Sequence, residues 1–435
     1  QHKNAKKVIY VFFISKKSKK LWQRYSIYLK ITNLQISKFA KSKIKYYLCS
    51  LKTLKKKIMS KLVSLVAFLW LIIACEKSGE DNDPSTQTST TQSTTTQTPT
   101  SPPITPPTPP QPPQNNIPYD WDFYLEPSRL NAVKKEPNVE LKKLYYQVYG
   151  TPCGGWYDGM SPNSEKNNGW LKTFVEGAER AHKTPIVVLY GIPERDCGSF
   201  SKGGHPNAAS YKAWIDRVSA IIGQRRAVVI IEPDAINYCG HKKGSAKYNE
   251  RAELLRYAAE KLNKNNPNVA SYIHAGNGPL VTNNPEAIAT AIIDGGLKYM
   301  RGFALNVSGL GGTAEEQAGA EKFVAYLATK GFKNVRYVID TERSGINRPK
   351  HQNANAPYNS CNNFNAALGP RSTTKTTGAH ADAYLWINGG GGSDGECNMG
   401  APAAGQPYPE YTRALVNNAI RVKSIEILEL PNNLK

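Results

Sequence analysis

The chain has few long hydrophobic runs and lacks the short motifs of several large enzyme classes. Its longest largely apolar run, at 62–74, has 13 residues, whereas a membrane-spanning helix needs about 20. There is no P-loop, no HExxH and no CxxC pair. The glycine runs at 309–312 and 389–392 stand alone, without a dinucleotide fingerprint. These absences argue against P-loop nucleotide hydrolysis, zinc proteolysis of the HExxH type and dithiol redox chemistry.

Residues 1–58 contain no Asp or Glu and hold 17 Lys and Arg, so they carry most of the formal charge of +22. The remaining 377 residues hold 39 basic and 34 acidic residues, a net of only +5. A basic-patch argument for nucleic-acid binding therefore depends on the first 58 residues alone, and we expect no nucleic-acid partner for the rest. We expect residues 1–58 to be a basic extension that is absent from the mature protein. A genuine basic arm is the alternative.

Residues 59–75 have the plan of an export signal. Lys61 precedes the apolar run, and the run ends in LIIAC, which resembles a bacterial lipobox. In that reading Cys75 carries lipid and anchors the protein to a membrane. An ordinary cleaved signal peptide is the alternative. Both readings predict a secreted or surface-anchored protein.

Residues 76–117 form a linker in which 84–116 are almost entirely Ser, Thr, Gln and Pro. Such a segment cannot bury a hydrophobic core. Pro-rich chains extend by about 3 Å per residue, so this one can span on the order of 100 Å. We interpret it as a spacer between the export signal and a folded domain.

Five cysteines lie beyond the lipobox, and their number fits an exported protein: Cys153, Cys197, Cys239, Cys361 and Cys397. The simplest arrangement is two disulfides and one odd thiol. Spacing alone leaves the pairing open.

Residues 118–435 are expected to form one folded, monomeric catalytic domain of the α/β class. Seven short apolar or β-branched runs are predicted strands: 142–150, 186–192, 228–232, 269–275, 301–307, 335–340 and 381–388. Amphipathic helices are predicted at 170–183, 209–223, 250–264, 286–294 and 314–331. Alternation of strands and helices predicts a parallel sheet. A parallel β/α barrel is favoured, and an open doubly wound sheet is the alternative.

Polar residues follow the predicted strands, where a parallel barrel places its chemistry. They are Tyr190 with Asp196, Glu232 with Asp234, His274, Asn306, Asp340 with Arg343, and Asn388 with Asp394. Several carboxylates from different strands are therefore expected to meet in one cleft. Paired carboxylates in an exported protein suggest polysaccharide hydrolysis, in which one acid protonates the leaving oxygen and a second carboxylate attacks or activates water.

Five segments carry a specific resemblance: VVLYGIPERDCGSFSKGG (187–204), VVIIEPDAI (228–236), RGFALNVSG (301–309), VIDTERSG (338–345) and DAYLWINGGGGSDGEC (382–397). In type and order they resemble glycoside hydrolase family 6, the cellobiohydrolases and endoglucanases. The resemblance implies a distorted, seven-stranded β/α barrel that hydrolyses β-1,4-glucan with inversion and needs no metal or cofactor. It also implies the disulfides Cys197–Cys239 and Cys361–Cys397.

The resemblance further implies residue roles. Asp234 matches the general acid, Asp196 the carboxylate that keeps this acid protonated, and Asp394 the proposed base. Tyr190 matches a tyrosine that crowds the sugar at the cleavage point. Arg195 and Arg343 match arginines that orient the carboxylates. We expect Glu232 and Asp340 to be structural rather than reactive.

The chain departs from the family pattern at sugar-binding positions. His274 replaces an aspartate and Leu280 a tryptophan, and Ser360, Asn388 and Gly392 also replace characteristic residues. His274, Asn306 and Asn388 remain candidate substrate contacts.

Three aromatic residues, Trp156, Tyr157 and Tyr238, are candidates for replacement stacking surfaces. The departures leave a second hypothesis open, namely a surface glycan-binding protein on the same fold with weakened or lost catalysis. The short segments that follow the EPD and NVSG motifs favour an open cleft.

Overall fold

The computed structural model describes residues 122–160 and 164–435. The expected basic extension (1–58), export signal (59–75) and linker (76–117) lie outside the described residues. Among the helices of the described ranges, none combines the length and the apolar character that a membrane crossing requires.

One sheet of seven parallel strands forms the centre of the fold, with the strands in chain order. They are β1 (Gly155–Tyr157), β2 (Ile186–Leu189), β3 (Ala227–Ile231), β4 (Val269–His274), β5 (Gly302–Leu305), β6 (Arg336–Asp340) and β7 (Ala381–Leu385). The sheet curls into a half-barrel, and its edges approach where the Gly154 N–H donates to the Trp386 carbonyl at 2.8 Å. The distorted barrel is confirmed, and the doubly wound alternative, whose strand order would reverse, is wrong.

The strands are apolar on both faces because both faces are covered. Ile186, Val188, Val228 and Ile230 belong to a buried cluster on one face of the sheet, whereas alternate residues such as Val229 pack with the helices. Side chains along a strand alternate between faces, so a strand buried on both sides reads as a continuous β-branched run.

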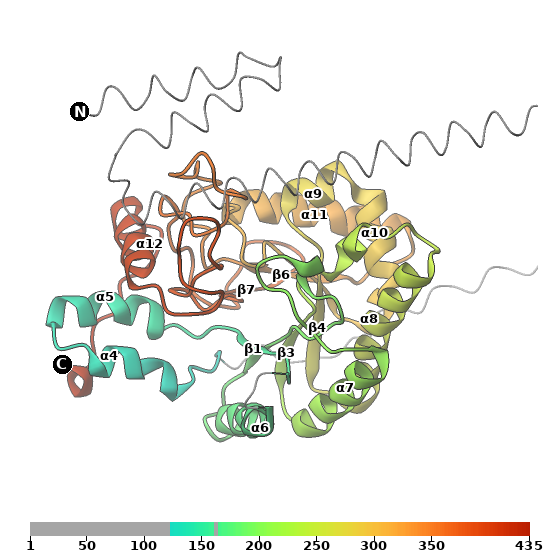
Figure 1. Ribbon diagram of the computed structural model, residues 1–435, viewed down its shortest axis with the longest axis horizontal. Coiled ribbons are helices and arrows are strands. Elements are labelled where there is room, and N and C mark those ends of the chain that lie inside the picture. The colour runs from blue at the N-terminus through green and yellow to red at the C-terminus, as the bar shows by residue number, and fades with distance from the viewer. Residues whose placement is uncertain (1–121, 161–163) are drawn as a thin grey trace, which may run out of the picture. The chain divides into compact units, whose positions relative to one another are not determined.

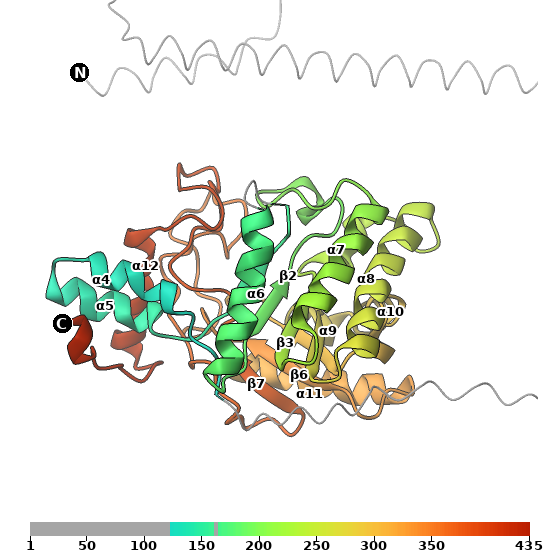
Figure 2. The ribbon, with the colours of Figure 1, turned by 90° about the horizontal axis from the view of Figure 1, so that it is seen from below.

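Most helices lie outside the sheet, between successive strands (Figure 1). They are α6 (Ser164–Arg180), α7 (Ala208–Ile222), α8 (Ala246–Asn265), α9 (Gly278–Asn283), α10 (Pro285–Asp294) and α11 (Thr313–Thr329). The side chains of Asn207, Ser245 and Asn277 cap α7, α8 and α9 by accepting a backbone N–H from the first turn. Figure 2 shows α6, α7 and α8 side by side along the sheet. The five predicted helices are confirmed, with α6 beginning earlier than expected.

A second group of helices packs at the other edge of the fold: α4 (Asn131–Lys135), α5 (Val139–Tyr149) and α12 (Pro409–Val422). Short 3-10 helices complete the structure: η2 (Pro127–Leu130), η3 (Asp196–Gly198), η4 (Ala235–Gly240), η5 (Leu297–Tyr299) and η6 (Asn432–Leu434). A separate hydrophobic cluster, which includes Val148, Trp386 and Leu415, joins α5 and α12 to the end of β7.

The strand predicted at 142–150 is wrong, because this segment is most of helix α5. The Asn138 side chain caps the helix by accepting the Leu141 N–H at 3.0 Å. Leu144 and Val148 then recur at a spacing of four and reach one cluster, which is helical rather than strand periodicity. The first strand is instead the three-residue β1. The other six predicted strands are confirmed.

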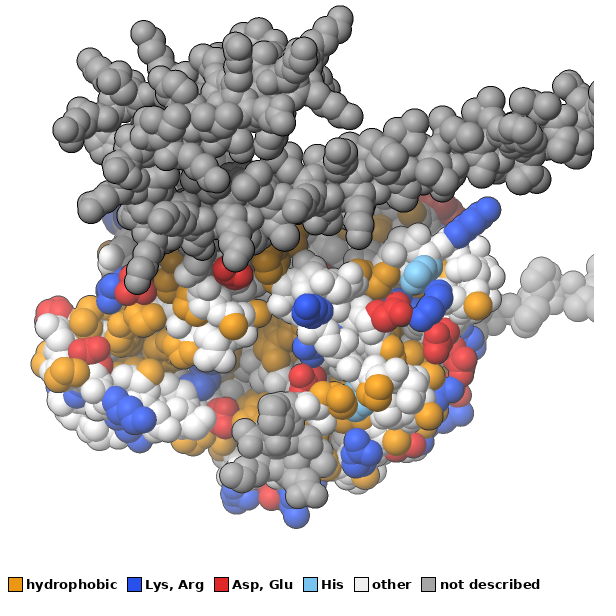
Figure 3. Space-filling model, viewed as in Figure 1, with side chains coloured by type: hydrophobic (Ala, Val, Ile, Leu, Met, Phe, Trp, Pro, Cys, Tyr) orange, Lys and Arg blue, Asp and Glu red, His pale blue; other side chains and the backbone are white. Residues whose placement is uncertain are grey.

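Charges of both signs are interspersed on the described surface in the view of Figure 3, notably over α7 and α8, while hydrophobic side chains gather over α5 and α12. Ion pairs such as Lys212–Glu253 and Lys261–Asp216 belong to this mixed surface. No broad face of one sign is visible on this side of the described domain, in line with its small net charge.

Candidate active site

Asp234 presents its carboxylate to solvent from a tightly held backbone. It lies three residues beyond β3, at the N-terminus of η4, and its φ of 65° puts it in the left-handed region. About half of its side chain (51%) is exposed, and its backbone N–H donates to Nδ1 of His274 at 3.0 Å. The apolar strand thus delivers one carboxylate to the rim in a fixed orientation.

His274, at the end of β4, is a buried neutral imidazole. Its Nδ1 accepts the Asp234 N–H, so the proton must lie on Nε2, which is 3.2 Å from the Gly276 carbonyl and donates to it. Burial lowers the pKa of the imidazole, and the Asp234 charge opposes that shift. The 3.6 Å approach of Nδ1 to Asp234 Oδ1 is therefore a contact of a neutral ring with a carboxylate.

Asp196 and Tyr190 share the electrostatic environment of Asp234. Asp196 lies in η3 after β2, and its Oδ2 accepts the Ser201 N–H at 2.8 Å. Burial raises the pKa of Asp196, and the charge of Asp234 raises it further. Burial also raises the pKa of the Tyr190 phenol, followed by the charges of Asp234 and Asp196. The Cys197–Cys239 disulfide joins η3 to η4, so Asp196 and Asp234 lie on neighbouring loops of the rim.

Arg195 binds the β2 end rather than the carboxylate of Asp196. It donates to the Tyr190 carbonyl at 2.7 Å and to Asp158 at 3.2 Å, and its guanidinium lies 4.7 Å from the centre of the Tyr190 ring. Its Nε also donates to the Ser201 carbonyl at 2.8 Å. Arg195 therefore fixes both Tyr190 and the loop that carries Asp196. Within the described residues, Arg195 pairs with Asp158 and Arg343 with Asp394, so neither of these ion pairs involves Asp196.

Asp394 is held by a buried arginine. Its Oδ2 accepts from Arg343 Nη1 at 2.6 Å and from the Asn362 N–H at 2.8 Å. The Asn362 side chain in turn accepts the Asp394 N–H at 2.8 Å. About 20% of the Asp394 side chain is exposed, whereas the Arg343 side chain is almost fully buried. The carboxylate keeps one oxygen free of these bonds, as a proton acceptor requires.

Three polar residues at neighbouring strand ends hold these ends together: Asn306 after β5, Asp340 at the end of β6 and Asn388 after β7. Asp340 accepts four backbone N–H groups, from Ser308, Glu342, Ile387 and Asn388, at 2.9 to 3.2 Å. The buried Asn306 side chain bonds only to backbone groups, including the Asp340 carbonyl at 2.9 Å. The Asn388 side chain accepts the Gly389 N–H at 2.8 Å. These geometries fit positioning of the rim more closely than direct sugar contacts.

Glu232, in the EPD motif, is fully buried and serves the neighbouring strand end. Its carboxylate accepts the Gly191 and Ile192 N–H groups at 3.0 to 3.1 Å. Burial raises its pKa to about 7. Glu232 therefore shapes the turn that leads from Tyr190 to Asp196, as a structural partner would.

Two disulfides, Cys197–Cys239 and Cys361–Cys397, staple the loops that surround these carboxylates, and Cys153 is a buried free thiol. Both expected pairings and the odd cysteine are confirmed. A hollow of about 510 Å³ opens beside Cys197–Cys239, lined among others by Arg195 and Lys202. It lies next to the Asp196 loop.

The loops that carry Asp196 and Asp394 touch each other. Ser199 Oγ lies 2.6 Å from the Tyr358 hydroxyl, and the Phe200 ring meets Tyr358 edge-on at 5.9 Å. Phe200 also packs so closely on Gly395 that a Cβ added there would lie 3.0 Å from it. These contacts bridge part of the rim, whereas the sequence favoured an open cleft.

Non-glycine residues with left-handed backbone gather at this rim. They include Glu194, Asp196, Cys197, Glu232, Asp234, Asn306 and Ser308. Such conformations cost on the order of 1–3 kcal/mol each and persist where surrounding bonds enforce them, often at functional sites. Here the enforcing bonds are those of His274, Glu232 and Asp340 described above.

Of the three candidate stacking aromatics, Trp156 has an accessible ring. It is 36% exposed, meets the Tyr190 ring edge-on at 5.0 Å and donates its Nε1–H to the Ile387 carbonyl at 3.0 Å. Tyr157 and Tyr238 are only 2% exposed, and Tyr238 stacks on Tyr248. The hypothesis that Tyr157 and Tyr238 offer sugar platforms is therefore wrong.

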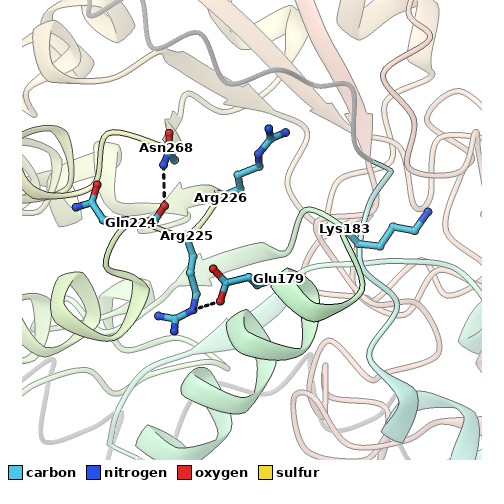
Figure 4. A pocket seen from close by; sticks show the side chains of 6 residues that line it. All are labelled: Glu179, Lys183, Gln224, Arg225, Arg226 and Asn268. Carbon is cyan, nitrogen blue, oxygen red and sulfur yellow. Dashed lines mark hydrogen bonds and ion pairs between the residues drawn. The ribbon is translucent and has the colours of Figure 1, made fainter.

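A smaller hollow, shown in Figure 4, lies at the opposite ends of the strands. It is lined by Glu179, Lys183, Gln224, Arg225, Arg226 and Asn268, which precede β2, β3 and β4. Arg225 pairs with Glu179 at 2.8 Å, and Asn268 donates to the Gln224 carbonyl at 2.7 Å. These two interactions link the amino ends of the strands. In barrel folds, residues at that face contribute to stability, and the chemistry lies at the opposite face.

Sequence reasoning missed Glu342, a fully buried acid next to Arg343. The available signal was a charged pair placed directly after an apolar strand, two residues beyond Asp340. In the described residues, 122–160 and 164–435, no group of three or more His, Cys, Asp or Glu side chains is arranged to hold a metal ion.

The fold and rim together define a class: a parallel β/α half-barrel with carboxylates, an arginine-held aspartate and exposed aromatics at the carboxyl ends of its strands. That arrangement is typical of barrel proteins that act on sugars. The family model for glycosyl hydrolases family 6 matches residues 123–419, and the chain belongs to this family. The resemblance seen in the motifs is thereby confirmed.

Similar proteins include endoglucanases of bacteria. Endoglucanase A of Cellulomonas fimi is 33% identical over 302 residues, which are 68% of this chain and 61% of that protein. Endoglucanase 1 of Streptomyces halstedii is 32% identical over 62% of this chain and 79% of that protein. The chain spans about three fifths of the length of the first two curated relatives, at 61% and 59%.

Among solved structures, the endoglucanase Cel6 from Mycobacterium tuberculosis is similar, with a TM-score of 0.60 and 35% sequence identity. The match covers 69% of this chain and 97% of that one. That structure was solved in complex with methyl-cellobiosyl-4-deoxy-4-thio-β-D-cellobioside.

Proposed function

We propose that this protein hydrolyses β-1,4-glucan, such as cellulose, with inversion at the anomeric carbon. One observation carries the proposal: the half-exposed carboxylate of Asp234 lies on a loop joined by Cys197–Cys239 to the loop of Asp196, while Asp394 is held by Arg343 on another loop of the rim. The endoglucanase relatives and the bound cellobioside analogue in the Mycobacterium tuberculosis enzyme support this substrate class.

In the proposed reaction, Asp234 gives its proton to the glycosidic oxygen as the bond from that oxygen to the anomeric carbon breaks. Water attacks the same carbon from the opposite face, and Asp394 accepts the water proton directly or through a second water. Asp196 is the proposed supporting carboxylate, and burial together with the charge of Asp234 raises the pKa of Asp196 itself. Tyr190, fixed by Arg195, crowds the sugar at the cleavage point.

The proposal is tested by expressing residues 118–435 in an oxidising host and measuring reducing ends and anomer ratio. Substrates are cello-oligosaccharides, a soluble cellulose derivative and mixed-linkage glucan. We expect α-anomer product from the wild type and a loss of at least about 10²-fold in kcat for Asp234→Asn. Asp216→Asn, on the outer face of α7, is the matched control and should retain activity. β-Anomer product, or full activity in Asp234→Asn, would contradict the mechanism.

A second candidate is a surface glycan-binding protein with lost catalysis. It is favoured by two departures from the family pattern that the resemblance implies: Leu280, exposed (37%) on α9 in place of the expected tryptophan, and Ser360. The same experiment separates the two: retained binding of cello-oligosaccharides without turnover, in the wild type, would favour the binding protein.

We also propose that residues 59–75 export the chain and that Cys75 anchors it through lipid, with 76–117 as spacer. The sequence pattern alone supports this. Metabolic labelling with palmitate in a bacterial host should mark the full-length protein and leave Cys75→Ser unlabelled. Wild-type protein that is soluble outside the cell and carries no palmitate label would indicate the cleaved signal peptide instead.

A further inference from the structure

Glu342 is a buried carboxyl group that the proposed reaction does not use. Its side chain is 1% exposed, in the turn after β6. Its Oε2 lies 3.3 Å from Arg343 Nε, yet neither atom makes a hydrogen bond. A Cβ added at Gly390 would lie 3.4 Å from Oε1, so the carboxyl also borders the glycine-rich loop that leads to Asp394.

Arg343 lies between two carboxylates of different accessibility. On one side, its Nη1 donates to Asp394 at 2.6 Å and to the Tyr411 hydroxyl at 2.9 Å, and its Nη2 donates to the Ser308 carbonyl. On the other side, its Nε faces Glu342. A single guanidinium thus interacts with the candidate base and with a buried acid that has no other partner for Oε2.

The charge of Glu342 changes within a pH range that an enzyme meets. Burial raises the pKa of Glu342 to about 8, and the negative charges of Asp340 and Asp394 act in the same direction. The positive charges of Arg343 and Arg129 oppose the shift. The other titratable groups that face it are the Cys153 thiol, ahead of β1, and the Tyr411 phenol on α12.

We propose that Glu342 is a positioning residue for Asp394, and that its charge state sets how firmly Arg343 holds the Asp394 carboxylate. While Glu342 is neutral, the Arg343 charge is directed to Asp394. Once Glu342 is ionised, it competes for the guanidinium through Nε, and the hold on Asp394 weakens. The inference rests on the proposed function only where it concerns activity.

The first test observes Asp394 directly and needs no turnover. The side-chain carboxyl carbon of Asp394 is labelled with ¹³C in residues 118–435 and assigned with Asp394→Asn. In the wild type we expect an inflection of its chemical shift near pH 8, because the change in the charge of Glu342 reaches Asp394 through the shared arginine. Glu342→Gln should remove this inflection. A wild-type titration that is flat between pH 6.5 and 9.5 would overturn the inference, even if Glu342→Gln did not fold.

The second test is the pH dependence of kcat. Glu342→Gln keeps the shape of the protonated acid, so activity at pH 6 should stay within about twofold of wild type. The pH at which kcat falls on the alkaline side should rise by about 0.5 unit or more. At pH 9 the kcat of Glu342→Gln should then be roughly threefold that of the wild type.

Glu316→Gln is the matched control. Glu316 is another buried glutamate, paired with Arg348, and burial raises its pKa to about 7. Its substitution should leave the alkaline limb in place. Equal shifts in both variants, or superimposable profiles for wild type and Glu342→Gln, would overturn the inference. Absence of wild-type turnover would count against the proposed function alone, and the NMR titration would still decide the role of Glu342.

Discussion

Asp234, Asp196 and Asp394 have the same side chain in three different surroundings. Asp234 is half exposed and receives no hydrogen bond to its carboxylate from the described protein groups. Burial and a neighbouring charge raise the pKa of Asp196. Asp394 is paired with a buried arginine. Environments that differ in this way separate the acid from the base in carboxylate pairs.

The His274 contact gives a prediction at the same scale. His274→Asn keeps an acceptor near the position of Nδ1, whereas His274→Ala leaves the Asp234 N–H without a partner. A hydrogen bond contributes about 0.5–1.5 kcal/mol net, so His274→Ala should lose at least that much unfolding free energy. It should also lose kcat roughly tenfold or more through disorder of Asp234.

His274→Asn should retain most of both quantities, measured by urea unfolding and by initial rates. The contact would have no role in holding Asp234 if the two variants behaved alike. In that case the cavity left by the imidazole would explain the loss.

Single residues also show where prediction from sequence ends. The EPD, RDC and SDG motifs predict roles for Asp234, Asp196 and Asp394, because such motifs fix both residue type and place in the chain, and these roles stay predictions. The burial of Tyr238, which donates to the Ala291 carbonyl, and of Glu342, which borders Gly390, depends on contacts between segments far apart in the sequence. No local pattern encodes those contacts, so two aromatics, Tyr157 and Tyr238, were misassigned and one acid was missed.

Among the elements, six of the seven strands were predictable because a strand buried on both faces must be apolar throughout. The segment 142–150 was wrongly predicted as a strand for a related reason. Its three tyrosines and Val148 favour strands locally, but α5 packs them at helical spacing against α12 and the C-terminal segment. The loops that bridge the rim, with Ser199 and Tyr358, depend on tertiary contact and left no periodic signal.

Loss of a disulfide should loosen this rim. Cys197–Cys239 closes a separation of 42 residues and joins η3, which holds Asp196, to η4, which follows Asp234. Loop-closure entropy for that length predicts that the double variant Cys197→Ser/Cys239→Ser loses about 4 kcal/mol of unfolding free energy.

Guanidinium unfolding of residues 118–435, with and without reductant, checks this expectation. The free thiol gives the control, since Cys153→Ala should leave the response to reductant unchanged. A double variant as stable as the oxidised wild type would show that packing alone fixes these two loops.

At the scale of the whole chain, charge is divided unevenly. Residues 1–58 hold 17 basic and no acidic residues, while the described surface carries interspersed signs. Phosphate contacts from Lys and Arg dominate non-specific nucleic-acid binding. Any binding of the full chain to a labelled duplex should therefore disappear when residues 1–58 are deleted. Residues 118–435 should show none at about 150 mM salt. Binding that survived in residues 118–435 would contradict the charge argument.

The buried acids make a prediction about the stability of the whole domain. Burial raises the pKa of Asp340 to about 6, of Glu232 and Glu316 to about 7, and of Glu342 to about 8. The unfolded chain releases these protons near pH 4, so between pH 4 and 8 the folded domain binds more protons than the unfolded one. Their contribution to stability is therefore full below about pH 4 and is lost as pH rises towards 8.

Urea unfolding of residues 118–435 at pH 5, 7 and 8.5 should accordingly give a free energy that falls with pH. When the pKa of one group differs by one between the folded and the unfolded chain, the free energy of unfolding changes by about 1.4 kcal/mol. Several such groups therefore make a fall of several kcal/mol over this range. Glu232→Gln and Glu342→Gln, which cannot ionise, should each flatten the decline. A free energy that rose between pH 5 and 8.5 would mean that these carboxyl groups are ionised in the folded protein, and that Glu342 holds its charge against Arg343 throughout.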